Sequence, residues 1–297
     1  MAAPRDPEEL DATAAPVRSH LPAGTAMGAV HLTVSDLERS LAYYRSAIGL
    51  EVLEHADGRA SLGAGGTELL GLVEEPGARP GTGYTGLYHF ALLVPRREQL
   101  AAWLAHAARD RVPLVGLSDH FVSEALYAAD PDGHGIEIYW DRPREVWEGE
   151  VAARLTTEPL DVDSLLGELD DPRTAPFDGL PAGTVMGHVH FKVADIPATV
   201  AFYRDALGFD LMAQLGRHAA FLSAGGYHHH VGANTWESRG APPPPPGTAA
   251  LRHATLTLPD AAARDAVLER LERHGHEIAD GPGVRDPSGN ALLLAVA

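Results

Sequence analysis

The chain repeats one phrase almost unchanged in its two halves. Leu21–His31 reads LPAGTAMGAVH, and Leu180–His190 reads LPAGTVMGHVH. Each copy ends on a histidine inside an apolar, strand-like run. The copies lie much further apart than the few tens of residues that separate solenoid repeats, so the pattern predicts a duplicated domain.

Each half is itself predicted to be double. In the first half, Asp36 is expected to cap a short amphipathic helix that Gly49 ends, and short strands separated by turns follow. A second strand opening occurs at residues 87–95, and its counterpart in the second half is at 251–259. Asp-Pro-x-Gly turns are typical of tight hairpins and close these later units. We therefore expect an α+β fold of four tandem βαβββ modules.

The predicted domain boundaries follow from these modules. Residues 1–24 are polar and rich in Ala and Pro, and we expect them to form a disordered lead-in. The first two-module domain is predicted at 25–145 and the second at 184–297. The segment 146–183 is rich in charge and proline and is expected to link the halves.

Composition excludes several classes of function. The formal net charge of −18 argues against partners such as nucleic acid or an anionic membrane surface, which bind clustered Lys and Arg. No apolar stretch is long enough to span a bilayer, so a cytoplasmic location is expected. The chain has no cysteine, which excludes disulfides, thiolate nucleophiles and Cys-ligated zinc. The sixteen histidines are the abundant reactive side chains that remain.

Histidines open a strand in all four modules, and one carboxylate lies on a closing strand. The candidates are His31, His89, His190 and His253 on the opening strands and Glu137 on the last strand of the second module. A buried glutamate between isoleucines is unfavourable unless it is paired or bound to a metal. Two histidines and one carboxylate are the ligand set of non-haem iron enzymes that handle dioxygen.

The residues around Glu137 form a longer motif. His120, Tyr127 and the turn Asp130–Gly133 precede Glu137 at spacings that closely resemble the signature of extradiol ring-cleavage dioxygenases, although Ser118 departs from it slightly. With the module order, this identifies the chain as similar to the vicinal-oxygen-chelate superfamily, which also holds glyoxalase I and bleomycin-resistance proteins. The resemblance implies two cup-shaped, mixed-sheet domains, with Glu137 as an iron ligand and with Tyr127 and His120 facing the substrate.

The third ligand depends on which modules pair into a cup. If the first and second modules pair, the ligands are His31, His89 and Glu137. If the second and third pair, His190 takes the place of His31. We favour His190, because the resemblance also requires a histidine for acid–base chemistry on the partner module.

That histidine is expected in the run His228–His230 of the third module. The matching segment of the first module, Thr67–Leu70, contains none. Side chains alternate along a strand, and counting from the glycine turn matches His229 to Glu137, so His229 is the expected inward member. An imidazole suits a proton shuttle near neutral pH.

The resemblance implies an extradiol (catechol 2,3-) dioxygenase that uses Fe(II), with Mn(II) also compatible with the ligands. Its partners would be a small aromatic diol and dioxygen, and edge pairing of such modules would permit a homo-oligomer. Two alternatives stay open. One is a glyoxalase-like, metal-dependent isomerase or lyase. The other is a non-catalytic resistance protein that sequesters a ligand in the cup.

Overall fold

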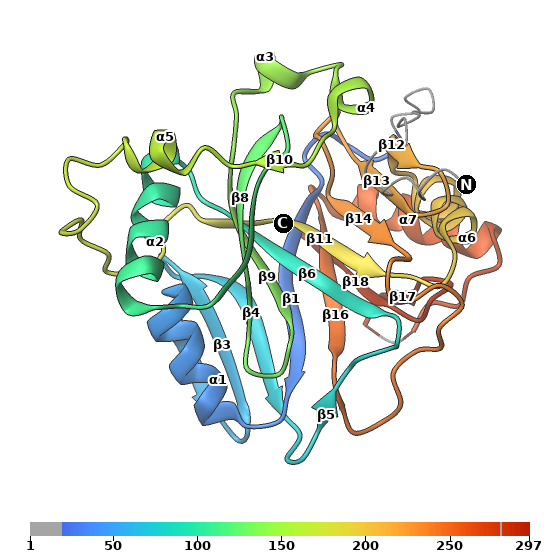
Figure 1. Cartoon of the computed structure of the whole chain (residues 1–297). Coiled ribbons are helices and arrows are strands. Elements are labelled where there is room, and N and C mark those ends of the chain that lie inside the picture. The colour runs from blue at the N-terminus through green and yellow to red at the C-terminus, as the bar shows by residue number, and fades with distance from the viewer. Residues whose placement is uncertain (1–19, 280) are drawn as a thin grey trace, which may run out of the picture.

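The computed structural model describes residues 20–279 and 281–297, so most of the predicted lead-in, residues 1–19, lies outside the described residues. Two large mixed sheets dominate the fold (Figure 1), and the prediction of an α+β class is confirmed. No helix among the described residues is both long enough and apolar enough to cross a membrane.

The inner-module sheet combines the second and third modules. Its nine strands run in the order β10 (Glu158–Pro159), β7 (Leu114–Asp119), β8 (Ser123–Ala129), β9 (Gly135–Asp141), β6 (Gly86–Leu93), β11 (Val185–Lys192), β14 (Val231–Asn234), β13 (Ala219–Ser223) and β12 (Asp210–Leu215). The two modules join where β6 and β11 pair antiparallel, and His89 lies opposite His190 in that register.

The outer-module sheet combines the first and fourth modules in the same way. Its seven strands run β17 (Gly283–Arg285), β18 (Ala291–Val296), β16 (Leu251–Leu258), β1 (Ala26–Val34), β4 (Thr67–Glu74), β3 (Arg59–Ala64) and β2 (Glu51–Ala56). β1 pairs antiparallel with β16, and His31 lies opposite His253. A short parallel bridge joins β5 (Arg79–Pro80) to β15 (Thr248–Ala249). The pairing that the sequence left open is therefore second with third and first with fourth.

The helices lie beside these sheets, with α1 and α2 on one side of the molecule and α6 and α7 on the other (Figure 1). Their bounds are α1 (Leu37–Tyr43), α2 (Arg97–Asp110), α3 (Arg144–Trp147), α4 (Val151–Arg154), α5 (Val162–Leu166), α6 (Ile196–Val200) and α7 (Ala261–Arg273), with π-helical turns at Tyr44–Ile48 and Ala201–Leu207. As predicted, the Asp36 side chain caps α1 by accepting the Arg39 N–H. Gly49 ends the following turn with a φ of 89°, a left-handed conformation that favours glycine.

Each Asp-Pro-x-Gly hairpin is tied to the helix of the preceding module. Asp130 Oδ1 accepts the backbone N–H groups of Asp132 and His134, and Oδ2 accepts the Tyr44 hydroxyl at 2.9 Å. Tyr203 and Asp286 repeat this contact in the second half. The sheets thus join modules across the halves, whereas these hydrogen bonds join the modules within each half.

We expect Tyr44→Phe to lower the free energy of unfolding by about 1–3 kcal/mol, because it removes a buried hydrogen bond to a carboxylate. Burial and Asp130 both raise the pKa of Tyr44, so the phenol is the donor. Urea unfolding measures the change. Tyr43→Phe is the matched control, since the buried Tyr43 hydroxyl has no hydrogen-bond partner in the described part of the chain. Equal losses for the two variants would contradict this role of Tyr44.

Candidate metal centre and cavity

Three adjacent strands place the polar side chains of the inner-module sheet on one face. Side chains alternate along a strand, so Glu137, Tyr139 and Asp141 of β9 share a face. His188 and His190 are related in the same way on β11. β6 lies between these two strands and contributes His89.

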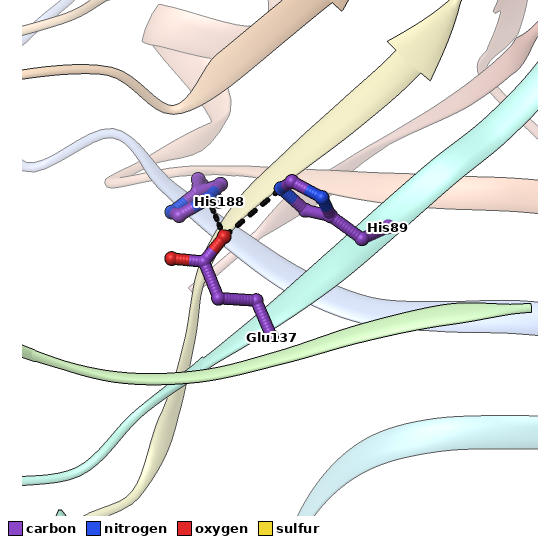
Figure 2. Close-up of side chains that lie close together, drawn as sticks. All are labelled: His89, Glu137 and His188. Atoms are coloured by element: carbon purple, nitrogen blue, oxygen red, sulfur yellow. Dashed lines mark hydrogen bonds and ion pairs between the residues drawn. The ribbon is translucent and has the colours of Figure 1, made fainter. Parts of the chain in front are cut away.

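Glu137, His89 and His188 bring their donor atoms together (Figure 2). Glu137 Oε2 lies 3.0 Å from His89 Nε2 and 3.2 Å from His188 Nε2, and all three side chains are buried. They form a group of potential metal-ligating atoms that lie within 4.8 Å of one another. Each residue comes from a different strand, so the sheet register fixes their separation.

The electrostatics of the group favour a carboxylate at Glu137 beside a neutral His188 imidazole. Burial acts to raise the pKa of Glu137, but His188 and His89 outweigh it and hold that pKa well below its usual value. Burial lowers the pKa of His188 despite the pull of Glu137. Deprotonated carboxylate and neutral imidazole are the forms that bind metal ions.

His190 lies next to this group but is not part of it. Its ring meets the His89 ring edge-on at 5.0 Å, and its Nε2 is buried with no hydrogen-bond partner among residues 20–279 and 281–297. Gly232 on β14 leaves room for the ring, because a Cβ there would lie only 2.8 Å from it. The sequence-based choice of His190 as third ligand therefore stays a prediction, whereas the geometry brings His188 into that place.

The alternative third ligand, His31, lies in the outer-module sheet. Its ring stacks on His253 at 4.3 Å, and its Nε2 is 3.9 Å from Glu68. The His31–His253 pair occupies the register position that His190–His89 occupies in the other sheet.

Sequence reasoning missed His188, although a signal for it was present. In the repeated phrase, Ala29 of the first copy becomes His188 in the second, and this is the only change from an apolar to a polar residue. The sequence-based choice of ligand considered the histidine shared by both copies, His31 or His190, and not the histidine that differs between them.

A cavity of about 480 Å³ opens onto this group of potential metal ligands. That volume falls in the range of small-molecule sites. All the candidate residues of the second and third modules line this cavity. Its walls also include Val115, Leu155, Phe221 and Trp236. Leu155, Thr156 and Thr157 come from the segment between the halves, which β10 anchors to β7.

His120 and Tyr127 form one hydrogen-bonded unit on the cavity wall. His120 Nδ1 lies 2.9 Å from the Thr156 carbonyl oxygen, and its Nε2 lies 2.7 Å from the Tyr127 hydroxyl. A carbonyl only accepts, so Nδ1 carries the proton, and in the neutral ring Nε2 accepts from Tyr127. The phenol proton is thus directed at His120, and the phenol oxygen is able to accept a second hydrogen bond.

The run His228–His230 does not lie on a strand as expected. β14 begins only at Val231, and all three histidines are buried in the preceding loop. The argument from alternating side chains therefore does not apply to them. Separate polar partners hold them instead: His230 Nδ1 accepts the Ala224 N–H at 3.2 Å, and His228 contacts Asp141. His229 still lines the cavity.

We expect His230 to make the protein less stable in acid. Burial, followed by electrostatic repulsion from the protonated forms of His228 and His188, lowers its pKa to about 3 from 6.5. The unfolded chain therefore takes up a proton below pH 6.5 that the folded chain refuses. Stability is lost as the pH falls from 6.5 towards 3, by about 2 kcal/mol at pH 5. Urea unfolding at pH 7 and pH 5 measures the loss.

His230→Asn is the matched variant for this test. An Asn oxygen can take the place of Nδ1 as acceptor for the Ala224 N–H, but it does not titrate. The variant should therefore lose about 2 kcal/mol less than the wild type between the two pH values. Equal losses would show that His230 is not the responsible group.

Comparison with known proteins places this fold and site in a family. The model of the Glyoxalase/Bleomycin resistance protein/Dioxygenase superfamily matches residues 26–138 and 185–293. The chain belongs to this superfamily. It is 42% identical to a catechol-2,3-dioxygenase of Bacillus subtilis (strain 168) over 281 residues, which cover 92% of this chain and 97% of the relative.

Solved structures share the fold at much lower identity. A putative dioxygenase from Bacillus subtilis aligns with a TM-score of 0.60 and 16% identity, over 91% of this chain and 85% of its own. Glyoxalase I from Zea mays aligns with a TM-score of 0.54, also at 16% identity, over 91% and 92% of the two chains. At this identity the likeness concerns the fold.

The residues present fit the divalent metal ion that such a family implies. Each of the two imidazole nitrogens lies about 3 Å from the carboxylate oxygen, which suits neighbouring ligands with metal–donor distances of about 2.1 Å. His89 Nε2 is also buried and forms no hydrogen bond among the described residues, although it lies 3.0 Å from Glu137 Oε2. A metal ion would satisfy this otherwise unfavourable nitrogen.

Proposed function

We propose that the protein is an Fe(II)-dependent extradiol dioxygenase that acts on a catechol-type aromatic diol, with His89, His188 and Glu137 as the metal ligands. The observation that carries the proposal is the convergence of two imidazoles and one carboxylate on a cavity of small-molecule size. The 42% identity to a catechol-2,3-dioxygenase supports the choice of reaction.

Three protein ligands leave positions for substrate and dioxygen on the cavity side. An iron ion held there would supply Lewis acidity toward the diol and electron exchange between the diol and dioxygen. The chain supplies ligand geometry, substrate orientation and proton management. Phe221 and Trp236 give the cavity apolar walls that suit an aromatic ring and exclude water.

Tyr127 and His229 are proposed to handle the substrate's protons. Because the Tyr127 proton is directed at His120, the phenol oxygen can accept a hydrogen bond from a diol hydroxyl. His229 lines the cavity, its ring centroid lies 4.2 Å from that of His188, and burial holds its pKa well below the usual value. A neutral imidazole at this position can take a proton from the substrate and return it to the product.

The decisive test is anaerobic reconstitution with Fe(II), followed by catechol and then oxygen. We expect one O₂ consumed per catechol and a yellow ring-opened product. Reconstitution with Mn(II) tests the second compatible metal. If the loaded protein consumes no oxygen with any of a panel of catechols, the proposal is wrong. Turnover of a glutathione hemithioacetal would then identify an isomerase, and tight ligand binding without turnover would identify a sequestering protein.

A further inference from the structure

A chain of buried and partly buried hydrogen bonds runs from the end of β9 to His229. Asp141 Oδ1 lies 2.9 Å from His228 Nε2, and His228 Nδ1 lies 2.8 Å from His229 Nδ1. The other carboxylate oxygen, Oδ2, accepts the Tyr227 hydroxyl at 2.7 Å. The Tyr227 oxygen lies 2.8 Å from the Tyr139 hydroxyl. Five side chains thus share one network beside the proposed metal ligands.

The chemistry of these groups fixes the position of each proton. A carboxylate only accepts, so His228 must carry its proton on Nε2. A neutral His228 that carries its proton on Nε2 has no proton on its second nitrogen, Nδ1. His228 Nδ1 is therefore an acceptor, and the nitrogen that faces it, His229 Nδ1, must donate. The remaining nitrogen of His229, Nε2, is left without a proton.

We propose that Asp141 and His228 are positioning residues that hold His229 in its Nδ1–H tautomer and so keep its Nε2 lone pair available to substrate in the cavity. The consequence for catalysis rests on the proposed function, whereas the tautomer itself does not. A base needs a bare nitrogen, and a free imidazole in water carries its proton mainly on Nε2, which is the wrong atom here. The network therefore selects the minor tautomer.

The network also explains why three adjacent histidines have different surroundings. His230 forms its hydrogen bonds with Ser223 and Ala224 and is not part of the chain of hydrogen bonds. Complete burial of His228 without a polar partner would be unfavourable, and Asp141 supplies that partner from the same strand as Glu137. One strand thus carries both the proposed metal ligand and the anchor of the proposed base.

The test reads the tautomer of His229 in the metal-free protein. Long-range ¹H–¹⁵N NMR of protein labelled with ¹⁵N-histidine distinguishes the two neutral tautomers, and His229→Gln assigns the signal. We expect the Nδ1–H form in the wild type. An Nε2–H form there would overturn the proposal, whatever the enzyme does.

Asp141→Asn should reverse this tautomer without changing the shape of the side chain. In the wild type Tyr227 donates to Asp141, so the Tyr139 hydroxyl must donate to Tyr227. In the variant the Tyr227 hydroxyl still donates in this direction, so the amide oxygen of Asn faces Tyr227. The amide N–H then faces His228 Nε2. His228 then donates through Nδ1, and His229 should switch to Nε2–H. An unchanged tautomer in a folded variant would refute the positioning role.

Two further variants, one inside the network and one outside it, are also read by the tautomer of His229 and so do not depend on the proposed reaction. His228→Phe removes the acceptor for His229 Nδ1–H and should also give the Nε2–H form. His230→Asn changes the neighbouring histidine outside the network and should leave the His229 tautomer as in the wild type. If the wild type proves active, Asp141→Asn should lower kcat by about 10²-fold or more with little change in KM or metal content. Lost metal instead would contradict the proposal.

Discussion

Replacing His188 by alanine is expected to abolish metal binding, whereas the same change at His190 should only weaken it, by about 10–100-fold. His188 Nε2 shares Glu137 Oε2 with His89, and His190 lies to the side, in edge-on contact with His89. Removing one of three ligands should weaken binding by more than the ~10–100-fold that loss of an outer contact causes. An effect of that smaller size is expected for His190→Ala.

Anaerobic titration with Mn(II), followed by electron paramagnetic resonance, measures the affinity without reference to activity. His31→Ala is the matched control, because His31 occupies the position of His190 in the outer-module sheet and should not change the affinity. Thermal unfolding of the metal-free variants checks that the buried substitutions leave the fold intact. Loss of metal in His190→Ala but not in His188→Ala would restore the sequence-based choice of ligand.

The modules could be predicted from sequence because their signals are local. The cap at Asp36, the glycine stop at Gly49 and the Asp130 hairpin are each specified by a few adjacent residues. Glu137 could be identified because a carboxylate in an apolar strand is unusual without a partner. These features do not depend on how distant strands are arranged.

Module pairing could not be decided in the same way. The opening strand of each module is apolar and pairs with only one strand of its own module; these strands are β1, β6, β11 and β16. Their other edges are available to another module, and the sequence does not specify which edges pair. For a related reason, the sequence alone could not decide between His188 and His190 as the third ligand. Both project from the same face of β11, and a bulge at Gly187 shifts the register against β6 next to His188. The tertiary structure therefore determines which of the two rings reaches Glu137.

The histidine run shows the same limit. Its members leave the strand pattern because long-range partners hold them, and the partner of His228 lies on β9, far away in the chain. The segment between the halves is a further example. Its charge and proline content predicted a linker, yet it carries the Thr156 carbonyl that sets the tautomer of His120. Backbone acceptors leave no signal in composition.

Replacing His229 by glutamine is expected to reduce kcat by about 10²–10⁴-fold while the metal affinity stays close to that of the wild type. The size is that of a lost general acid–base group. Metal retention follows from the geometry, since the group of converging donor atoms contains His89, Glu137 and His188 but not His229. Oxygen uptake with catechol measures the rate, and the Mn(II) titration measures the affinity.

This variant also distinguishes the two enzyme classes that the cavity would suit, a dioxygenase and a metal-dependent isomerase. If His229 coordinates the metal together with the other three residues, His229→Gln should lower the metal affinity, and four protein ligands would favour Lewis-acid isomerase chemistry. If His229 serves as the base, affinity persists and only the rate falls. His230→Asn controls for changes in the loop, because His230 is held by Ser223 and Ala224 and does not line the cavity. A fall in rate equal to that of His229→Gln in this control would assign the effect to the loop and not to the imidazole.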